Sequence, residues 1–168
     1  MKQHQITIDI AAYGWQGESW QGFYPADLPE DWRLDFYSNE HRAVVVPAAI
    51  WESSCADDVE DWLDAVHDEF RFYFEAAPGL KPSDDLLAAI AVLGDQFGGW
   101  IGRNSNNVET PSIWYEGADQ PRQMREAIDS LFTNLGEHQH GVVVVNSTEE
   151  PWQVASDMRQ LVELMGYG

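Results

Sequence analysis

The sequence predicts an α/β domain built on a largely parallel sheet, and three observations support that prediction. Strand-like and helix-like runs alternate along the whole chain, which is the order of repeated βα units. Residues 43–46 and 141–146 are dominated by valine, as is typical of strands buried on both faces. The length of 168 residues is that of one domain, so we expect residues 1–168 to fold as a single domain.

The first elements follow from local patterns. Residues 5–12 have the pattern of a strand, and residues 32–40 can form a short helix before the buried strand at 43–46. Ser53 or Ser54 can cap the next helix, whose acidic first turn suits the positive end of the helix dipole. The apolar residues of that helix recur at helical spacing and should face the core: Val59, Trp62, Leu63, Val66 and Phe70.

The remaining elements continue this alternation. Further strands are expected at residues 70–75, 98–102, 112–116 and 141–146. Further helices are expected at residues 83–93, 121–135 and 149–165. Pro151 suits the first turn of the last helix, where its missing N–H is not needed. The sequence therefore predicts six strands in total.

The connection at residues 14–29 is the most informative stretch of the chain. It carries four aromatic side chains among three glycines and two prolines: Trp15, Trp20, Phe23 and Tyr24. Exposed aromatic area lowers solubility, so we expect this loop either to fold down as a lid or to form a binding rim. Trp15, Trp20 and Tyr24 are therefore candidate ligand-binding residues that can stack on a flat ligand such as a sugar. The structural alternative is that they close the top of the fold.

The same loop resembles the opening motif of a known family. The matching residues are Gly14-Trp15, Trp20, Gly22-Phe23-Tyr24-Pro25 and Leu28-Pro29. They are similar to the YecE-like family of unknown function, also called domain of unknown function seventy-two. Weaker similarity continues through residues 34–38, 70–74, 93–98, 112–117 and 141–164.

This resemblance implies a reduced TIM-barrel-like (β/α) fold with about six mostly parallel strands. Family members are longer, so the chain would keep the first four barrel strands and the last two. The alternative is a flavodoxin-like open sheet with helices on both faces. Six parallel strands do not easily close at the usual eight-strand geometry, and open sheet edges are normally covered. A homodimer that covers the open edge is therefore a hypothesis.

The family's polar residues at the carboxyl ends of the strands, where barrel enzymes hold their functional groups, are mostly replaced here. Glu75 and Lys81 stand where the family has Lys and then Thr-His, and residues 102–106 and 114–117 depart from its pattern. Asn146 alone remains of a final Asn pair. The resemblance therefore implies a divergent member that has lost or replaced the ancestral site.

The residues left near those strand ends supply the candidate site. Glu75 and Glu116 follow different strands and can form a carboxylate pair for acid/base chemistry, so they are the candidate catalytic residues. Arg103 and Asn146 lie at the same predicted rim and are candidates for ligand binding. The alternative for all four is that they are rim residues without a chemical role.

The chain is strongly acidic, with 29 acidic against 9 basic residues and a net charge of −20. Such a surface repels phosphates, so we expect neither nucleic acid nor a membrane as a partner. Two interpretations stay open: an acid-rich solvated surface, or recognition of a basic or cationic partner. Cys55 is the only cysteine, and no signal-like or membrane-spanning run is visible, so we expect a cytoplasmic protein.

Other residues have simpler explanations than the chemistry they suggest. Four carboxylates can share one helix face and offer oxygens to a divalent cation, although a solvated face explains them: Asp57, Asp61, Asp64 and Asp68. His138 and His140 lack a visible third metal ligand. Cys55 is expected to be a buried thiol, and no glycine-rich phosphate loop follows a strand. We therefore predict no metal site and no cofactor.

Two functions remain. The preferred one is a non-catalytic member that binds a small ligand or a protein partner through the aromatic rim. The alternative is a hydrolase or isomerase that uses Glu75 and Glu116, with or without the help of a metal.

Overall fold

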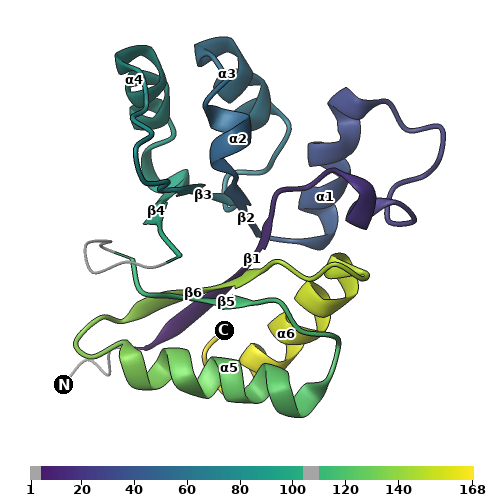
Figure 1. Ribbon diagram of the computed structural model, residues 1–168, viewed down its shortest axis with the longest axis vertical. Coiled ribbons are helices and arrows are strands. Elements are labelled where there is room, and N and C mark those ends of the chain that lie inside the picture. The colour runs from purple at the N-terminus through teal and green to yellow at the C-terminus, as the bar shows by residue number, and fades with distance from the viewer. Residues whose placement is uncertain (1–4, 104–109) are drawn as a thin grey trace.

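One six-stranded sheet forms the centre of the molecule. The computed structural model describes residues 5–103 and 110–168. Its strands are β1 (Thr7–Tyr13), β2 (Ala43–Val46), β3 (Arg71–Glu75), β4 (Phe97–Ile101), β5 (Ser112–Tyr115) and β6 (His140–Val145). They are arranged in the order β4-β3-β2-β1-β6-β5, and each of the five strand pairs is parallel (Figure 1).

This strand order is that of a barrel opened between β4 and β5. The first strand lies between the second and the last, as it does in a closed (β/α) barrel. The helix-packed clusters lie on the same face, since alternate residues such as Val44, Phe72 and Val143 all point outward to helices. The reduced TIM-barrel-like fold is therefore confirmed as a curled half-barrel. The flavodoxin-like alternative, with helices on both faces, is wrong, and the predicted homodimer stays a prediction.

The helices divide into two groups on the outer face. They are α1 (Arg33–Glu40), α2 (Ala48–Trp51), α3 (Ala56–Asp64), α4 (Asp84–Val92), α5 (Pro121–Asn134) and α6 (Pro151–Leu164), with short 3-10 turns η1 (Glu18–Trp20), η2 (Glu30–Trp32) and η3 (Gly94–Gln96). In the view of Figure 1, α1 to α4 lie in the upper part of the molecule, and α5 and α6 lie in the lower part. In the described part of the chain, no helix is both long and apolar enough to cross a membrane.

The helix starts show which local predictions were right. Ser83 caps α4, where its Oγ accepts a hydrogen bond of 3.1 Å from the Leu86 N–H. The predicted serine cap of α3 is wrong, because α2 intervenes and the Ser54 hydroxyl donates back to the Ile50 carbonyl at 2.7 Å. Cys55 occupies the cap, and its N–H donates to Asp58 Oδ2 at 2.7 Å. Cys55 is also exposed, so the predicted buried thiol is wrong.

The two groups of helices cover cores of different composition. The core under α1 to α4, called here the aromatic half, buries Trp15, Trp20, Tyr37, Trp51, Phe70, Phe72 and Phe74. The core under α5 and α6, called the aliphatic half, buries mainly Ile, Val, Leu, Ala and Met side chains, with Tyr115 as its one buried aromatic ring among the described residues.

The inner, concave face of the sheet is filled rather than hollow. Ala11 and Ala43 leave space above β1 and β2, and the buried ring of Tyr73 occupies it. The Tyr73 hydroxyl lies 2.6 Å from Asp9 Oδ2 and 2.7 Å from His140 Nε2. Since β3 and β6 are separated by two strands, this contact shows how tightly the sheet curls. A Cβ at Gly98 would collide with the Tyr73 ring, so only glycine fits there.

Candidate functional site

The carboxyl edge of the sheet gathers the side chains that the sequence placed at the barrel mouth. Glu75 ends β3, Arg103 follows β4, Glu116 follows β5 and Asn146 follows β6. All strands are parallel, so these four positions lie at one edge. Asn104, Ser105 and Asn106 of the same predicted rim lie outside the described residues.

Glu75 is used to fix two neighbouring elements. Its Oε1 accepts hydrogen bonds from the Tyr13 hydroxyl at 2.7 Å and from the Ala48 N–H at 2.9 Å. Its backbone carbonyl accepts a further bond of 2.9 Å from the Trp51 indole. Burial, and then the Glu75 carboxylate, raise the pKa of Tyr13, so this phenol stays a hydrogen-bond donor. The carboxylate therefore ties the end of β1 to the start of α2.

Glu116 belongs to a second group, which adjoins the first where Arg103 lies over the Tyr13 ring, 5.8 Å from its centroid. Its Oε1 lies 3.4 Å from Arg103 Nη1 and accepts a hydrogen bond of 3.2 Å from the Asn146 side chain. The Arg103 guanidinium also lies over the ring of Trp114, 4.4 Å from its centroid, in cation–π geometry. The two predicted carboxylates thus reach the same edge, but different donors hold each of them. The contacts of Glu116 connect the residues that follow β4, β5 and β6 at the barrel mouth.

The opposite, amino end of the concave face carries a polar network that sequence reasoning missed. Asp9 Oδ2 lies 3.5 Å from Arg71 Nη1, and the Thr7 hydroxyl lies 2.9 Å from His140 Nδ1. Burial lowers the pKa of His140, and the nearby Asp9 carboxylate opposes that effect. Strand alternation was the available signal, because Thr7, Asp9 and Arg71 alternate with outward apolar residues. At the amino end of a barrel such a network serves stability.

The aromatic loop is folded down onto the protein. Trp20 is 3% exposed and packs against Phe23, Tyr37, His41 and Trp152 at centroid distances of 5.3 to 6.4 Å. The Tyr24 hydroxyl donates a short hydrogen bond to the Trp15 carbonyl, which pins the loop to itself. Trp20 and Tyr24 line a small cavity of about 310 Å³ beside Arg33.

Trp15 lines a larger cavity, which we call the tryptophan groove. It has a volume of about 700 Å³ and lies between η2 with the start of α1 on one side and α3 on the other. Its lining comprises Trp15, Gln16, Glu30, Asp31, Trp32, Leu34, Asp35, Asp58, Asp61, Trp62, Asp64 and Ala65. This volume is within the range of pockets that hold small molecules.

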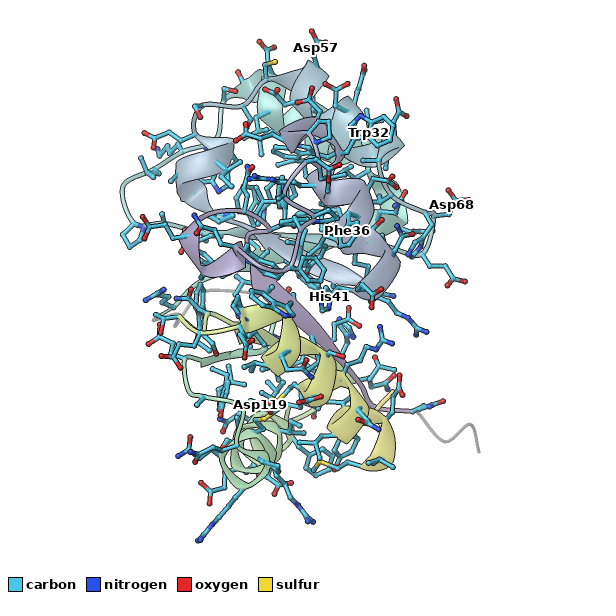
Figure 2. The ribbon with its side chains drawn as sticks, turned by 90° about the vertical axis from the view of Figure 1, so that its right-hand side faces the viewer. Trp32, Phe36, His41, Asp57, Asp68 and Asp119 are labelled. Atoms are coloured by element: carbon cyan, nitrogen blue, oxygen red, sulfur yellow. The ribbon has the colours of Figure 1, made fainter. Side chains whose placement is uncertain are left out.

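Three indoles at different depths shape this groove. Trp15 is 4% exposed and meets Trp62 edge to face, with ring centroids 5.7 Å apart at 78°. Trp32 is 62% exposed, and Figure 2 shows it at the surface of the upper half of the molecule. Trp32 therefore presents an open indole face at the edge of the groove.

Six carboxylates stand on the two walls of the groove. Glu30, Asp31 and Asp35 come from η2 and α1, and the other three come from α3: Asp58, Asp61 and Asp64. The predicted acidic face is thus partly right. Asp61 and Asp64 do share the groove, whereas Asp57 lies on the far side of α3, in its cavity with α4, and Asp68 follows the end of the helix. Among the described residues, no three His, Cys, Asp or Glu side chains are grouped so that they could hold one metal ion.

The structure distributes the predicted ligand-binding residues over three places instead of one site. Trp15 lines the tryptophan groove, Trp20 and Tyr24 line the smaller cavity, and Arg103 and Asn146 lie at the barrel mouth. Sequence reasoning missed Trp32 and Trp62 as groove residues. The signal for Trp62 was its helical spacing from Asp58 and Ala65, which puts a ring and a carboxylate on one face of α3.

Comparisons with known proteins concern the family and the fold. The family model described as "Protein of unknown function DUF72" matches residues 10–145. No curated protein is significantly similar to the chain. A DUF72 family protein of Thermotoga maritima MSB8 has a similar structure, with a TM-score of 0.59 and 9% identity over 94% of this chain and 99% of that chain. A DUF72 family protein of Enterococcus faecalis V583 matches with a TM-score of 0.40 and 12% identity over 96% of this chain and 61% of that chain.

Proposed function

The chain belongs to the DUF72 family of unknown function, and from that premise we propose that it is a ligand-binding, non-catalytic member whose binding site is the tryptophan groove. The observation that carries this proposal is a cavity of about 700 Å³ lined by three indoles, one of them 62% exposed. Pockets for small molecules are concave and combine apolar and aromatic side chains with polar groups that fix orientation, and the polar groups of this groove are carboxylates and Gln16.

The state of the barrel mouth supports a binding role over the alternative of a hydrolase or isomerase. An acid/base pair needs two carboxylates that reach one substrate. Glu75 is engaged by Tyr13 and by the Ala48 N–H, while Glu116 is engaged by Arg103 and Asn146. The concave face beneath them is filled by buried side chains such as Tyr73 and Ile101.

Indole N–H resonances offer a direct test, since the chain has 8 tryptophans. We would titrate the labelled protein with a fixed set of cationic, neutral and anionic fragments and follow these signals. The proposal expects at least one class to shift Trp15, Trp32 and Trp62 together, while Trp51, buried in the core, and Trp100, packed against it, stay unchanged. Signals would be assigned with single Trp→Phe variants. Selective shifts of Trp114 at the mouth, or of no indole, would contradict the proposal.

A further inference from the structure

The charge of the tryptophan groove is unbalanced. Three carboxylates face it from each wall, and within the described residues the ion pair recorded for them is Arg33 with Glu30, at 3.9 Å. Facing walls of the same sign repel each other in the empty groove. A ligand that carries positive charge would remove that repulsion, whereas an anion would add to it.

The aromatic surface of the groove favours the same kind of ligand. Among aromatic side chains, tryptophan has the ring face that attracts cations most strongly. Trp32 holds most of its surface open to solvent, and Trp62 is partly exposed beside it in the lining. Methylene groups can pack on these rings while the charges that flank them face the carboxylates.

The spacing of the carboxylates distinguishes a chain of charges from a single ion. In the residues that the structure describes, they are not gathered into a group that could hold one metal ion. They lie instead along η2, the first turn of α1 and successive turns of α3. A ligand that matches them must distribute several positive charges over a length of several ångströms, with apolar links between the charges.

We propose that the tryptophan groove binds a linear polyamine, a small molecule with several ammonium groups joined by methylene links. This inference rests on the proposed function and names the ligand class of the same site. Ammonium groups would pair with carboxylates of both walls, and the methylene links would lie against Trp32 and Trp62. The acidity of the chain then has a local role at this groove in addition to its general role in solvation.

Calorimetric titration with spermidine tests the proposal. In the native chain we expect saturable binding that weakens with added salt, because the pairs are partly exposed. Trp32→Ala removes one cation–π partner and Asp61→Asn removes one charge, and each should weaken binding roughly threefold. Trp32 and Asp61 are both exposed, so neither substitution threatens the core.

Asp68→Asn is the matched control. It makes the same charge change four residues beyond Asp64, on an exposed side chain outside the groove, which Figure 2 shows at the surface. Binding to this variant should equal binding to the native chain. If Asp68→Asn weakens spermidine as much as Asp61→Asn does, the effect is the long-range field of the whole protein, and the proposal is overturned.

Further probes separate the remaining occupants. If hexane-1,6-diol shifts the three groove indoles and spermidine does not, the groove binds ligands but the ligand is not a cation, so this inference fails while the proposed function stands. If neither probe nor any fragment shifts them, both fail.

Tight competition by Mg²⁺ that does not depend on Trp32 would assign the carboxylates to a metal ion. Hexalysine that binds far more tightly than spermidine would assign the groove to a basic protein segment. Either result would overturn the proposal.

Discussion

The aromatic half and the aliphatic half of this molecule solve the same packing problem in different ways. Both cover one outer face of the same curled sheet, yet the first buries Trp, Tyr and Phe rings while the second buries mainly aliphatic side chains. The aromatic half has helices of 4 to 9 residues, and the aliphatic half has two helices of 14. Large rings can fill the irregular spaces between short helices, whereas long helices offer regular ridges for smaller side chains.

This difference also separates scaffold from candidate site. The tryptophan groove, of about 700 Å³, lies in the aromatic half between α1 and α3, whereas the cavity between α5 and α6 measures about 170 Å³. Short helices and long connections leave grooves that regular packing would close. The half with the irregular outer layer is therefore the one that holds the proposed binding site.

The largest expected effect is the loss of Trp20 from the aromatic half. Trp20→Ala would remove a buried ring that contacts five other rings and should lower the free energy of unfolding by about 3–5 kcal/mol. Urea unfolding measures this loss. Met158→Ala, the matched change in the aliphatic half, should cost less, about 2–3 kcal/mol, because smaller side chains around it can relax. If Met158→Ala costs more than Trp20→Ala, the contrast between the halves is wrong.

The stability of the contact region between the two halves should depend on pH. His41 is 5% exposed among the rings of Trp20, Phe23 and Tyr37, and Figure 2 shows it near the middle of the molecule. Burial, with a smaller contribution from Arg159 on α6, lowers its pKa to about 4. A lowered pKa means that the fold favours the neutral ring. The stability from His41 is therefore complete above pH 6.5, where the unfolded residue is also neutral, and is lost as the pH falls toward 4.

The expected loss over that interval is on the order of 3 kcal/mol. Urea unfolding at pH 7, 6, 5 and 4.5 measures it, and His41→Phe should flatten the part of the slope that His41 causes. The acidic residues titrate in both proteins, so the difference between the two curves carries the result. Equal slopes in the native chain and in His41→Phe would contradict the assignment.

A smaller effect is expected inside the sheet that both halves share. Tyr73→Phe would remove the hydroxyl between Asp9 and His140 and leave polar groups of the concave face less well paired. We expect a loss of about 1–3 kcal/mol in the free energy of unfolding. Tyr167→Phe, on a ring that stacks on Phe132 near the surface, is the control and should change stability by less than about 0.5 kcal/mol. If Tyr73→Phe leaves the free energy of unfolding unchanged, the network contributes nothing to stability.

The smallest effect on stability should come from the contacts of Arg103 at the barrel mouth. Arg103→Gln would remove the ion pair with Glu116 and the cation–π contact with Trp114, both at half-exposed side chains. Thermal unfolding should show a loss of about 1 kcal/mol or less, because water screens such contacts. The same variant should leave spermidine binding at the tryptophan groove unchanged. A large loss of that binding would place the ligand at the mouth and contradict the proposed function.

Much of the fold could be predicted from local patterns. The predicted strands and the helices predicted at residues 83–93, 121–135 and 149–165 agree with the structure to within about two residues, because valine runs and helical spacing reflect burial directly. The helix predicted to carry Val66 and Phe70 was too long, because α3 ends at Asp64. The opening motif predicted the family, and the family model confirms it. The helix α2 was missed because four residues, Ala48–Trp51, are too short to show a period. The predicted cap at Ser53 or Ser54 failed for the same reason, since that missed helix uses the serine.

The candidate site was harder to predict, because its residues meet only in the folded chain. The sequence identified Trp15 and the acidic run around Asp61, but it gave no means to join them. The tryptophan groove exists because the folded chain places η2 and the start of α1 opposite α3. The carboxylates at the mouth illustrate the reverse case. Glu75 and Glu116 do reach one edge, as the parallel strands required, but their donors come from other elements, and those contacts decided what each carboxylate does.

The sequence by itself determined the class of fold, the order of its elements, the acidity of the surface and the family. All four depend on composition and on patterns within about fifteen residues, where local physical preferences dominate. Only the tertiary structure decided that the aromatic loop buries Trp20, that the concave face is filled by Tyr73, and that three tryptophans and six carboxylates line one groove. The physical reason is that curling a parallel sheet brings together side chains from strands and helices far apart in the chain. A local sequence pattern holds no information about such contacts.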